Sequence, residues 1–265
     1  MHGSSSVITL SDRIVVNPNS RPALRLFLFH HAGASAAAML PLARQVPPAV
    51  EAVAFELAGR GVRSAEPAAQ SFTQARDDLL GRVGDMLDVP VVLFGHSLGG
   101  LLADSLARAL ALTGAAVARR VIVSACPCPS AGQHSPDSSR RPVQQLKAQL
   151  RTHGGTPQAV FDCPELLEYV LRVLGDDMVL ADTVTEPLRT APASLRHEFW
   201  FGDSDQSTAP STAEAWRMTL ASEPEVRFFA GGHFYLFERL SDVGQALRAL
   251  LSDEITAIAA PEGHV

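Results

Sequence analysis

The sequence predicts an α/β fold in which helices flank a mostly parallel central sheet. β-prone and helix-prone segments alternate along the chain, as they do in parallel βαβ units. One connection between a strand and a helix is especially clear. A buried-strand pattern at residues 91–94 is followed by Gly-His-Ser-Leu-Gly at residues 95–99 and then by a helix-prone segment. The length of 265 residues and the hydrophobic content of 46% suit one domain, residues 1–265, with a large core.

The individual elements follow from short β-prone runs and longer helix-prone runs that are separated by turn residues. Strands are expected near residues 24–30, 51–56, 90–95, 120–124, 195–201 and 225–230. Helices are expected near residues 36–46, 72–88, 98–113, 209–221 and 240–253. No internal repeat is visible in this order, so a single sheet covered by helices accounts for most of the chain.

The alternation stops between residues 127 and 192, where Ser-, Pro- and Gly-rich pieces separate helix-prone runs at residues 143–152 and 164–174. A long insertion between two sheet strands commonly forms a cap over the functional site, so we expect residues 127–192 to form one. Its apolar face would consist of Leu146, Leu150, Phe161, Leu166, Leu167, Val170, Leu171 and Met178. Of these, Leu167, Leu171 and Met178 are the candidates for substrate contact. The alternative is a satellite core without a substrate role.

The segment at residues 95–99 has the form of a nucleophile elbow, the strand-turn-helix motif of the α/β-hydrolase fold. Gly95 and Gly99 lack a Cβ, so the strand and the helix can approach closely around the turn. Ser97 would then project above the sheet as a nucleophile, and the amide of Leu98 would face a developing oxyanion. The alternative is an ordinary βα turn in which Ser97 caps the helix.

A serine nucleophile needs a base, and the chain order in this fold is Ser, then Asp or Glu, then His. Most of the nine histidines precede Ser97 or lie in terminal, polar or strand-like segments. His233 instead follows the strand-like residues 226–230 and a Gly-Gly pair, in a loop at the carboxyl end of a strand. Open α/β sheets place their sites at that end, so we expect His233 to be the base.

The orienting acid should come from the loop after the preceding strand, where residues 202–205 read Gly-Asp-Ser-Asp. Asp203 and Asp205 are both candidates. The loop one strand earlier, residues 125–129, contains no carboxylate and is a poorer choice. In the alternative interpretation, one or both aspartates merely cap the next helix.

The second donor to an oxyanion comes, in this fold, from the loop after an early strand. Residues 30–35 read His-His-Ala-Gly-Ala-Ser, and the small side chains among them would let the backbone approach a substrate carbonyl. We assign this donor to the amide of Ala32. The paired histidines have no Cys or carboxylate at ligand spacing, so we expect no metal site there.

Together these motifs resemble those of type II thioesterases, the free-standing editing hydrolases of polyketide and non-ribosomal peptide synthesis. The resemblance covers about residues 24–251 and is carried chiefly by residues 28–35, 94–100 and 231–237. His30 stands where the family usually has proline, and Leu98 stands where it has methionine. These departures leave the triad intact and bear on the substrate range.

The resemblance implies a serine thioesterase that removes acyl groups from the phosphopantetheine arms of acyl or peptidyl carrier domains. The family's Gly-x-x-Asp segment corresponds to residues 202–205, and its second acid is the triad member, which implies Asp205. The enzyme would need no cofactor, since phosphopantetheine belongs to the carrier substrate. Carrier domains are generally acidic, so the candidates for docking them are Arg60, Arg63, Arg140 and Arg141.

Composition narrows the range of partners and cellular locations that we expect for the protein. The net charge of -6 argues against nucleic acid as a partner, and no apolar run is long enough to cross a bilayer. Residues 1–19 lack the pattern of a signal peptide, so we expect a cytoplasmic protein, and we expect a monomer. The alternatives are a serine esterase or lipase on the same fold, acyl transfer or cyclisation onto a nucleophile other than water, and a non-hydrolytic carrier-binding scaffold.

Overall fold

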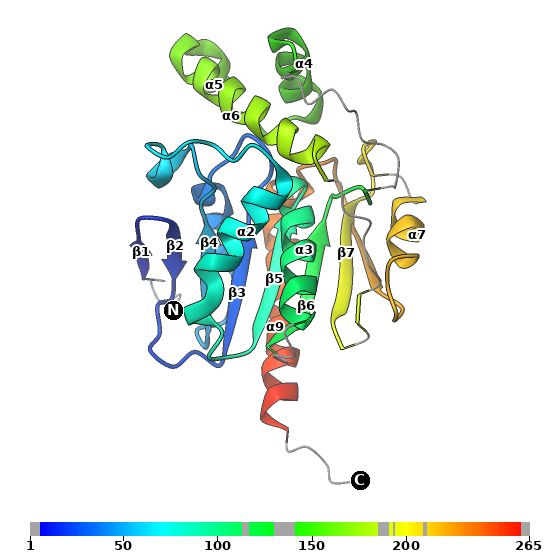
Figure 1. The fold of residues 1–265 in the computed structure, drawn as a ribbon. Helices are drawn as coiled ribbons and strands as arrows, with labels where there is room; N and C mark the ends of the chain where they lie inside the picture. Colours follow the sequence, from blue (N-terminus) through cyan, green and yellow to red (C-terminus); the bar gives the residue numbers. More distant parts are fainter. Residues whose placement is uncertain are drawn as a thin grey trace.

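The computed structural model describes residues 6–112, 117–129, 141–184, 191–192, 194–208 and 211–260. These residues form an eight-stranded sheet in the order β1-β2-β4-β3-β5-β6-β7-β8 (Figure 1). The strands are β1 (Val7–Thr9), β2 (Arg13–Val16), β3 (Leu24–Phe29), β4 (Val50–Phe55), β5 (Val91–His96), β6 (Ala118–Ser124), β7 (Arg196–Gly202) and β8 (Glu225–Phe229). Strands β3 to β8 are parallel, whereas β1 and β2 form an antiparallel edge beside β4.

The predicted α/β-hydrolase fold is confirmed, and each predicted strand is present with bounds that differ by at most two residues. The two antiparallel strands β1 and β2 were not predicted. They are three and four residues long, and every residue of β1 is exposed. Such short runs fall at or below the length at which a strand pattern can be distinguished from a loop.

The helices cover both faces of the sheet. They are α1 (Leu40–Ala43), α2 (Phe72–Val83), α3 (Leu98–Leu112), α4 (Val143–His153), α5 (Gln158–Asp162), α6 (Pro164–Asp182), α7 (Ser211–Arg217), α8 (Tyr235–Glu238) and α9 (Leu240–Ala259). Figure 1 shows α2 and α3 in front of the sheet and α9 behind it. One buried cluster joins the sheet to α2, α3 and α7, and a second joins it to α1, α8 and α9.

Some predicted helices are shorter or divided. The helix expected at residues 36–46 is a 3-10 turn, η1 (Ala36–Met39), followed by the short α1. Pro41 accounts for the break, because it lacks the N–H that a continuous helix would donate to the preceding turn. The helix expected at residues 209–221 is α7, and residues 209–210 lie outside the described part of the chain.

The helices α4, α5 and α6 lie together beyond the end of the sheet at which β5 passes into α3 (Figure 1). We call them the cap helices. Their own small core consists of Leu146, Leu171, Leu174 and Met178. Within the insertion expected at residues 127–192, residues 130–140 and 185–190 lie outside the described residues, as does residue 193 just after it. In the part of the chain that the structure describes, no helix combines the length and apolarity that a membrane span requires.

Candidate active site

The turn between β5 and α3 places Ser97 in a strained conformation. Its φ is 55°, in the left-handed region that residues with a Cβ seldom occupy. Two backbone hydrogen bonds hold it there: the Ser97 N–H donates to the Ser124 carbonyl at 2.8 Å, and the Gly100 N–H donates to the Ser97 carbonyl at 2.8 Å. The surrounding structure therefore fixes the serine in the geometry expected of a nucleophile elbow.

The glycines of this turn are required by close backbone contacts. A Cβ on Gly95 would lie 1.8 Å from the carbonyl oxygen of Gly99. A Cβ on Gly99 would lie 2.2 Å from the carbonyl oxygen of Phe29, at the end of β3. Since no side chain fits at either position, the sequence Gly-x-Ser-x-Gly brings Ser97 directly beside the loop that follows β3.

His233 lies in the loop after β8 and pairs with Asp205 from the loop after β7. The distance between His233 Nδ1 and Asp205 Oδ2 is 2.9 Å. Asp203, the other candidate, is exposed and accepts a hydrogen bond from the Gly231 N–H at 3.1 Å. The structure therefore brings Asp205 to the histidine, whereas Asp203 supports the loop that carries it.

Asp205 is held as a carboxylate by its hydrogen bonds. Burial opposes its charge, but hydrogen bonds from His233, Ser207 and Thr208 outweigh burial and hold the pKa of Asp205 well below its usual value. The Ser207 N–H and hydroxyl donate to Oδ1 at 2.8 and 2.6 Å, and the Thr208 hydroxyl donates to Oδ2 at 2.8 Å. An ionised Asp205 accepts the Nδ1 proton of His233 and leaves the Nε2 atom free to act as a base.

Ser207 was not identified from the sequence. Its hydroxyl lies 3.0 Å from His233 Nδ1 as well as 2.6 Å from Asp205, so it contacts both members of the pair. Because the hydroxyl donates to the carboxylate, it is left as an acceptor for the His233 Nδ1 proton. A serine two residues after an aspartate is typical of an Asx-turn, and this pattern at residues 205–208 would have been the signal.

Ser97 and His233 both line a cavity of about 240 Å³. The two residues predicted to supply oxyanion donors, Ala32 and Leu98, line the same cavity. Leu98 is the first residue of α3, so its N–H has no partner within the helix and lies at the positive end of the helix dipole. Ser97, His233 and the two residues predicted to supply oxyanion donors thus line one cavity.

The cap helices form the opposite wall of this cavity. Met178 lines the cavity, as expected, together with Leu150, Val170 and Leu174. Leu167 and Leu171 do not. They line a separate groove of about 800 Å³ between α4 and α6. They lie on the side of α6 that faces this outer groove and the cap's own core, and their contact with substrate stays a prediction.

A buried ion pair connects the cap to the loop that carries Ala32. Arg60 is 2% exposed and forms a two-pronged pair with Asp177 of α6, which is fully buried. Asp177 also accepts a hydrogen bond from the Gly33 N–H at 2.7 Å, and Arg60 donates to the Ala34 carbonyl at 3.2 Å. The loop of the predicted oxyanion donor, Ala32, is therefore held by hydrogen bonds with two charged side chains.

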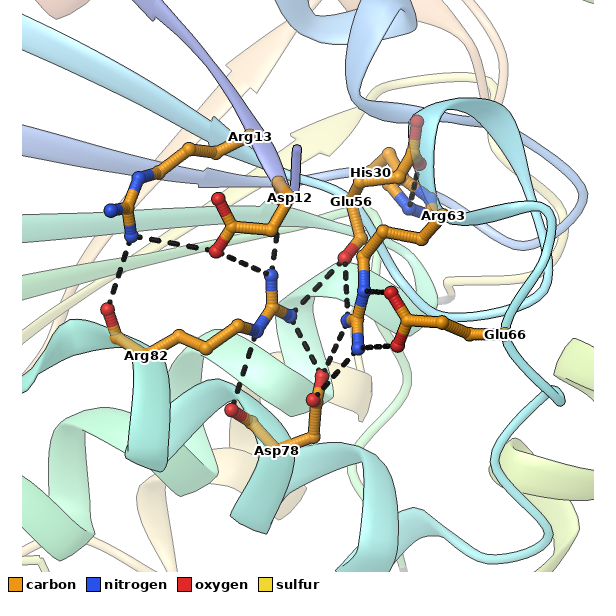
Figure 2. A network of polar contacts seen from close by, with 8 residues as sticks. All are labelled: Asp12, Arg13, His30, Glu56, Arg63, Glu66, Asp78 and Arg82. Atoms are coloured by element: carbon orange, nitrogen blue, oxygen red, sulfur yellow. Dashed lines mark hydrogen bonds and ion pairs between the residues drawn. The ribbon is translucent and has the colours of Figure 1, made fainter. Parts of the chain in front are cut away.

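Arg63, in the 3-10 turn η2 (Gly61–Arg63), is also buried, at 6% exposure. Figure 2 shows Arg63 and Arg82 converging on the carboxylate of Asp78 and the backbone carbonyl of Glu56. These contacts fix the loop after β4.

The predicted docking role of Arg60 and Arg63 is at odds with their burial. Among the other docking candidates, Arg141 pairs with Asp182 at 2.9 Å, and Arg140 lies outside the described residues.

Two further histidine rings lie beside that of His233, and a third lies beside one of these two. The ring centroids of His96 and His153 lie 5.3 and 5.0 Å from that of His233, and the ring of His31 lies 5.9 Å from that of His96. Burial lowers the pKa of His31 to about 3 and places the pKa of His96 well below its usual value, so both rings are neutral near pH 7. No group of three or more His, Cys, Asp or Glu residues in the described ranges is arranged to hold a metal ion.

Comparison with known proteins agrees with this geometry. A family model described as a thioesterase domain matches residues 24–251. The chain is 29% identical over 272 residues to the probable cadicidin biosynthesis thioesterase of Streptomyces griseus, covering 98% of this chain and 73% of that protein. It is 30% identical over 234 residues to the thioesterase PikA5 of Streptomyces venezuelae, covering 85% and 79%. The solved structure of the type II thioesterase BorB, from the borrelidin biosynthetic cluster, matches with a TM-score of 0.76 and 28% identity, over 94% of this chain and all of that one.

Replacing Asp177 by Asn should destabilise the protein, because it leaves Arg60 as an unpaired buried cation. We expect a loss of about 3–5 kcal/mol in the free energy of unfolding, measured by urea denaturation. The matched control is Asp182→Asn, at the end of the same helix, because the pair of Asp182 with Arg141 is partly exposed. That variant should lose less than about 1 kcal/mol. Equal losses would contradict the central role of the buried pair.

Replacing Ser207 by Ala should slow the reaction of Ser97 with a fluorophosphonate reagent by about tenfold, because His233 loses one partner of Nδ1. Thr208→Ala removes a hydrogen bond from Asp205 alone and should have a smaller effect. The downfield proton resonance of His233 Nδ1 should shift in the Ser207 variant more than in the Thr208 variant. A resonance unchanged in both variants would show that the Ser207 contact is incidental.

Proposed function

Since this chain belongs to the thioesterase family and has the α/β-hydrolase fold, we propose that it hydrolyses acyl thioesters through Ser97, His233 and Asp205. The observation that carries this proposal is the convergence of a strained serine and an Asp-paired histidine on one cavity. Each of these residues comes from a different loop at the carboxyl end of the sheet. A chance loop histidine would not be expected to meet all of these conditions.

In the first half of the proposed reaction, His233 Nε2 removes the hydroxyl proton of Ser97 while Oγ attacks the thioester carbonyl. The amides of Ala32 and Leu98 donate to the oxyanion that develops on the carbonyl oxygen. Asp205 stabilises the imidazolium that forms on His233. The carbon–sulfur bond then breaks, and His233 returns the proton to the departing thiolate.

In the second half, water attacks the acyl-serine ester. His233 Nε2 takes a proton from the water and delivers it to Ser97 Oγ as the carbon–oxygen bond breaks, which releases the free acid. All of the groups in this scheme belong to the protein or the substrate, so the scheme requires no cofactor. A hydroxyl or amine of the acyl group could replace water, which would give acyl transfer or cyclisation instead.

The proposed substrate is an acyl group on the phosphopantetheine arm of an acyl or peptidyl carrier domain. The relatives that support it are named as thioesterases of cadicidin biosynthesis, PikA5 and BorB of the borrelidin cluster. Because Arg60 and Arg63 are buried, we do not assign carrier docking to them. The proposal also includes a cytoplasmic monomer that removes stalled or aberrant acyl groups from a modular synthase.

The proposal is tested by mass spectrometry of an acyl-loaded carrier domain before and after incubation with the protein. We expect loss of the acyl group, and turnover should fall by roughly 10³–10⁴-fold in Asp205→Asn because His233 is no longer oriented correctly. Ser97→Ala should be at least as severe, since triad members act as a unit. Asp203→Asn is the matched control and should retain most activity, because the hydrogen bonds of Asp203 to described residues come from the Gly231 N–H and the Ser204 hydroxyl.

The same assay with a matched oxygen ester separates a thioesterase from a general esterase. Faster turnover of the oxygen ester than of the thioester would favour the esterase alternative. Full activity of Ser97→Ala would overturn the mechanism, and greater loss in Asp203→Asn than in Asp205→Asn would reassign the acid.

The cap wall of the cavity predicts where acyl-chain preference is determined. Val170 lines the cavity, and Leu167, one turn earlier on α6, lines the outer groove. Val170→Phe should lower kcat/KM for an octanoyl thioester about tenfold more than for an acetyl thioester, since it fills space in a cavity of about 240 Å³. Leu167→Phe should leave the ratio of the two substrates nearly unchanged. If Leu167→Phe changed the ratio of the two substrates more than Val170→Phe did, the outer groove would be the acyl pocket.

A further inference from the structure

The cap places a second imidazole beside the base. His153 is the last residue of α4, and its ring centroid lies 5.0 Å from that of His233 at an interplanar angle of 66°. It lines the same cavity as Ser97. The proposed triad leaves this histidine without a role, although its ring lies against that of His233.

The turn after α4 holds His153 in this position. Gly154 and Gly155 have φ values of 73° and 76°, in the left-handed region that glycine adopts easily. A Cβ on Gly155 would lie 2.6 Å from the ring of Phe234, the residue after His233. The end of α4 thus packs directly against the loop that carries the base, and it does so because the sequence has glycine there.

Hydrogen bonding defines which nitrogen of His153 carries the proton in the neutral ring. Its Nδ1 lies 3.1 Å from the Gln149 carbonyl, one turn back on α4. A carbonyl can only accept, so Nδ1 carries the proton, and in the neutral ring Nε2 is left with a lone pair. The Nδ1 atom of His233 is likewise occupied by Asp205 and Ser207. Each ring therefore has Nε2 available as an acceptor.

The two Nε2 acceptors lie on residues that line one cavity, and a water molecule has two O–H bonds, one for each acceptor. We propose that His153 is a catalytic residue for deacylation, whose Nε2 accepts one hydrogen of the hydrolytic water while His233 Nε2 removes the other. The water oxygen forms the bond to the acyl carbon, the bond from that carbon to Ser97 Oγ breaks, and the proton passes through His233 to Oγ. His153 gains and loses no proton, and it acts by orienting the water.

This inference rests on the proposed acyl-enzyme and makes a separate statement about its second half. Acylation uses the Ser97 hydroxyl and requires no water, so it does not need the His153 acceptor. Deacylation does need it. A cap contact that merely stabilised the fold would affect both halves together, so the ratio of the two rates distinguishes the two roles.

The test uses the full-length protein and an acyl thioester of N-acetylcysteamine, with rapid quenching and intact-protein mass spectrometry to follow acyl-Ser97. His153→Ala should accumulate the acyl-enzyme, with deacylation slowed about tenfold or more and acylation much less affected. His153→Phe keeps a ring against His233 but lacks an acceptor, so it should behave like the alanine variant. His153→Gln supplies an acceptor and should recover part of the deacylation rate. Gln144→Ala, an exposed position on α4, is the matched control.

The outcomes separate the two proposals. An acyl-enzyme that forms in His153→Ala and His153→Phe and decays at the wild-type rate would overturn the role of His153 and leave the triad standing. Equal slowing of acylation and deacylation would also overturn it, in favour of a structural contact. If no acyl group appears on Ser97 in the wild type or any variant, the proposed function itself fails.

Discussion

The buried ion pair between Arg60 and Asp177 is the interaction on which the arrangement of the site depends. Asp177 belongs to the cap and Arg60 to the loop after β4, yet both bind the loop after β3 through Gly33 and Ala34. Removing two charges from water is costly unless their hydrogen bonds are well satisfied, and the two-pronged geometry satisfies most of them. The cap helices and the loop of the predicted oxyanion donor are therefore positioned together, so a displacement of one would disturb the other.

The electrostatics of the cavity follow from burial. Desolvation lowers the pKa of His30 and His31 to about 3, so these rings stay uncharged beside the predicted oxyanion donor. His96 is neutral for the same reason. Asp205 remains ionised because three side chains hydrogen-bond to it. The ring of His233 thus lies between an ionised carboxylate and the uncharged ring of His96.

Much of the fold was predictable because its determinants are local. The elbow around Ser97, the six parallel strands and the loop of His233 each have a short pattern of turn glycines and β-prone residues. The partners of Arg60 depend on contacts across the fold, so no local pattern in the sequence reveals them. The contact of Ser207 with His233 also spans the fold, and only a weak local pattern indicates it. Leu167 and Leu171 were predicted to contact substrate, yet they line the outer groove rather than the cavity of Ser97, for a related reason. The spacing of apolar residues along α6 identifies the residues that are buried. However, α6 has a cavity on one side and a groove on the other, and this spacing does not show which residues face the cavity and which face the groove.

The left-handed backbone of Ser97 limits what chemistry this scaffold can acquire. A β-branched residue is strongly disfavoured at a φ of 55°, because its second Cβ substituent meets the neighbouring backbone. A threonine would bring a comparable hydroxyl but would be strained in this turn. The backbone conformation therefore restricts this position to unbranched side chains, whatever the reactivity of the group that they carry.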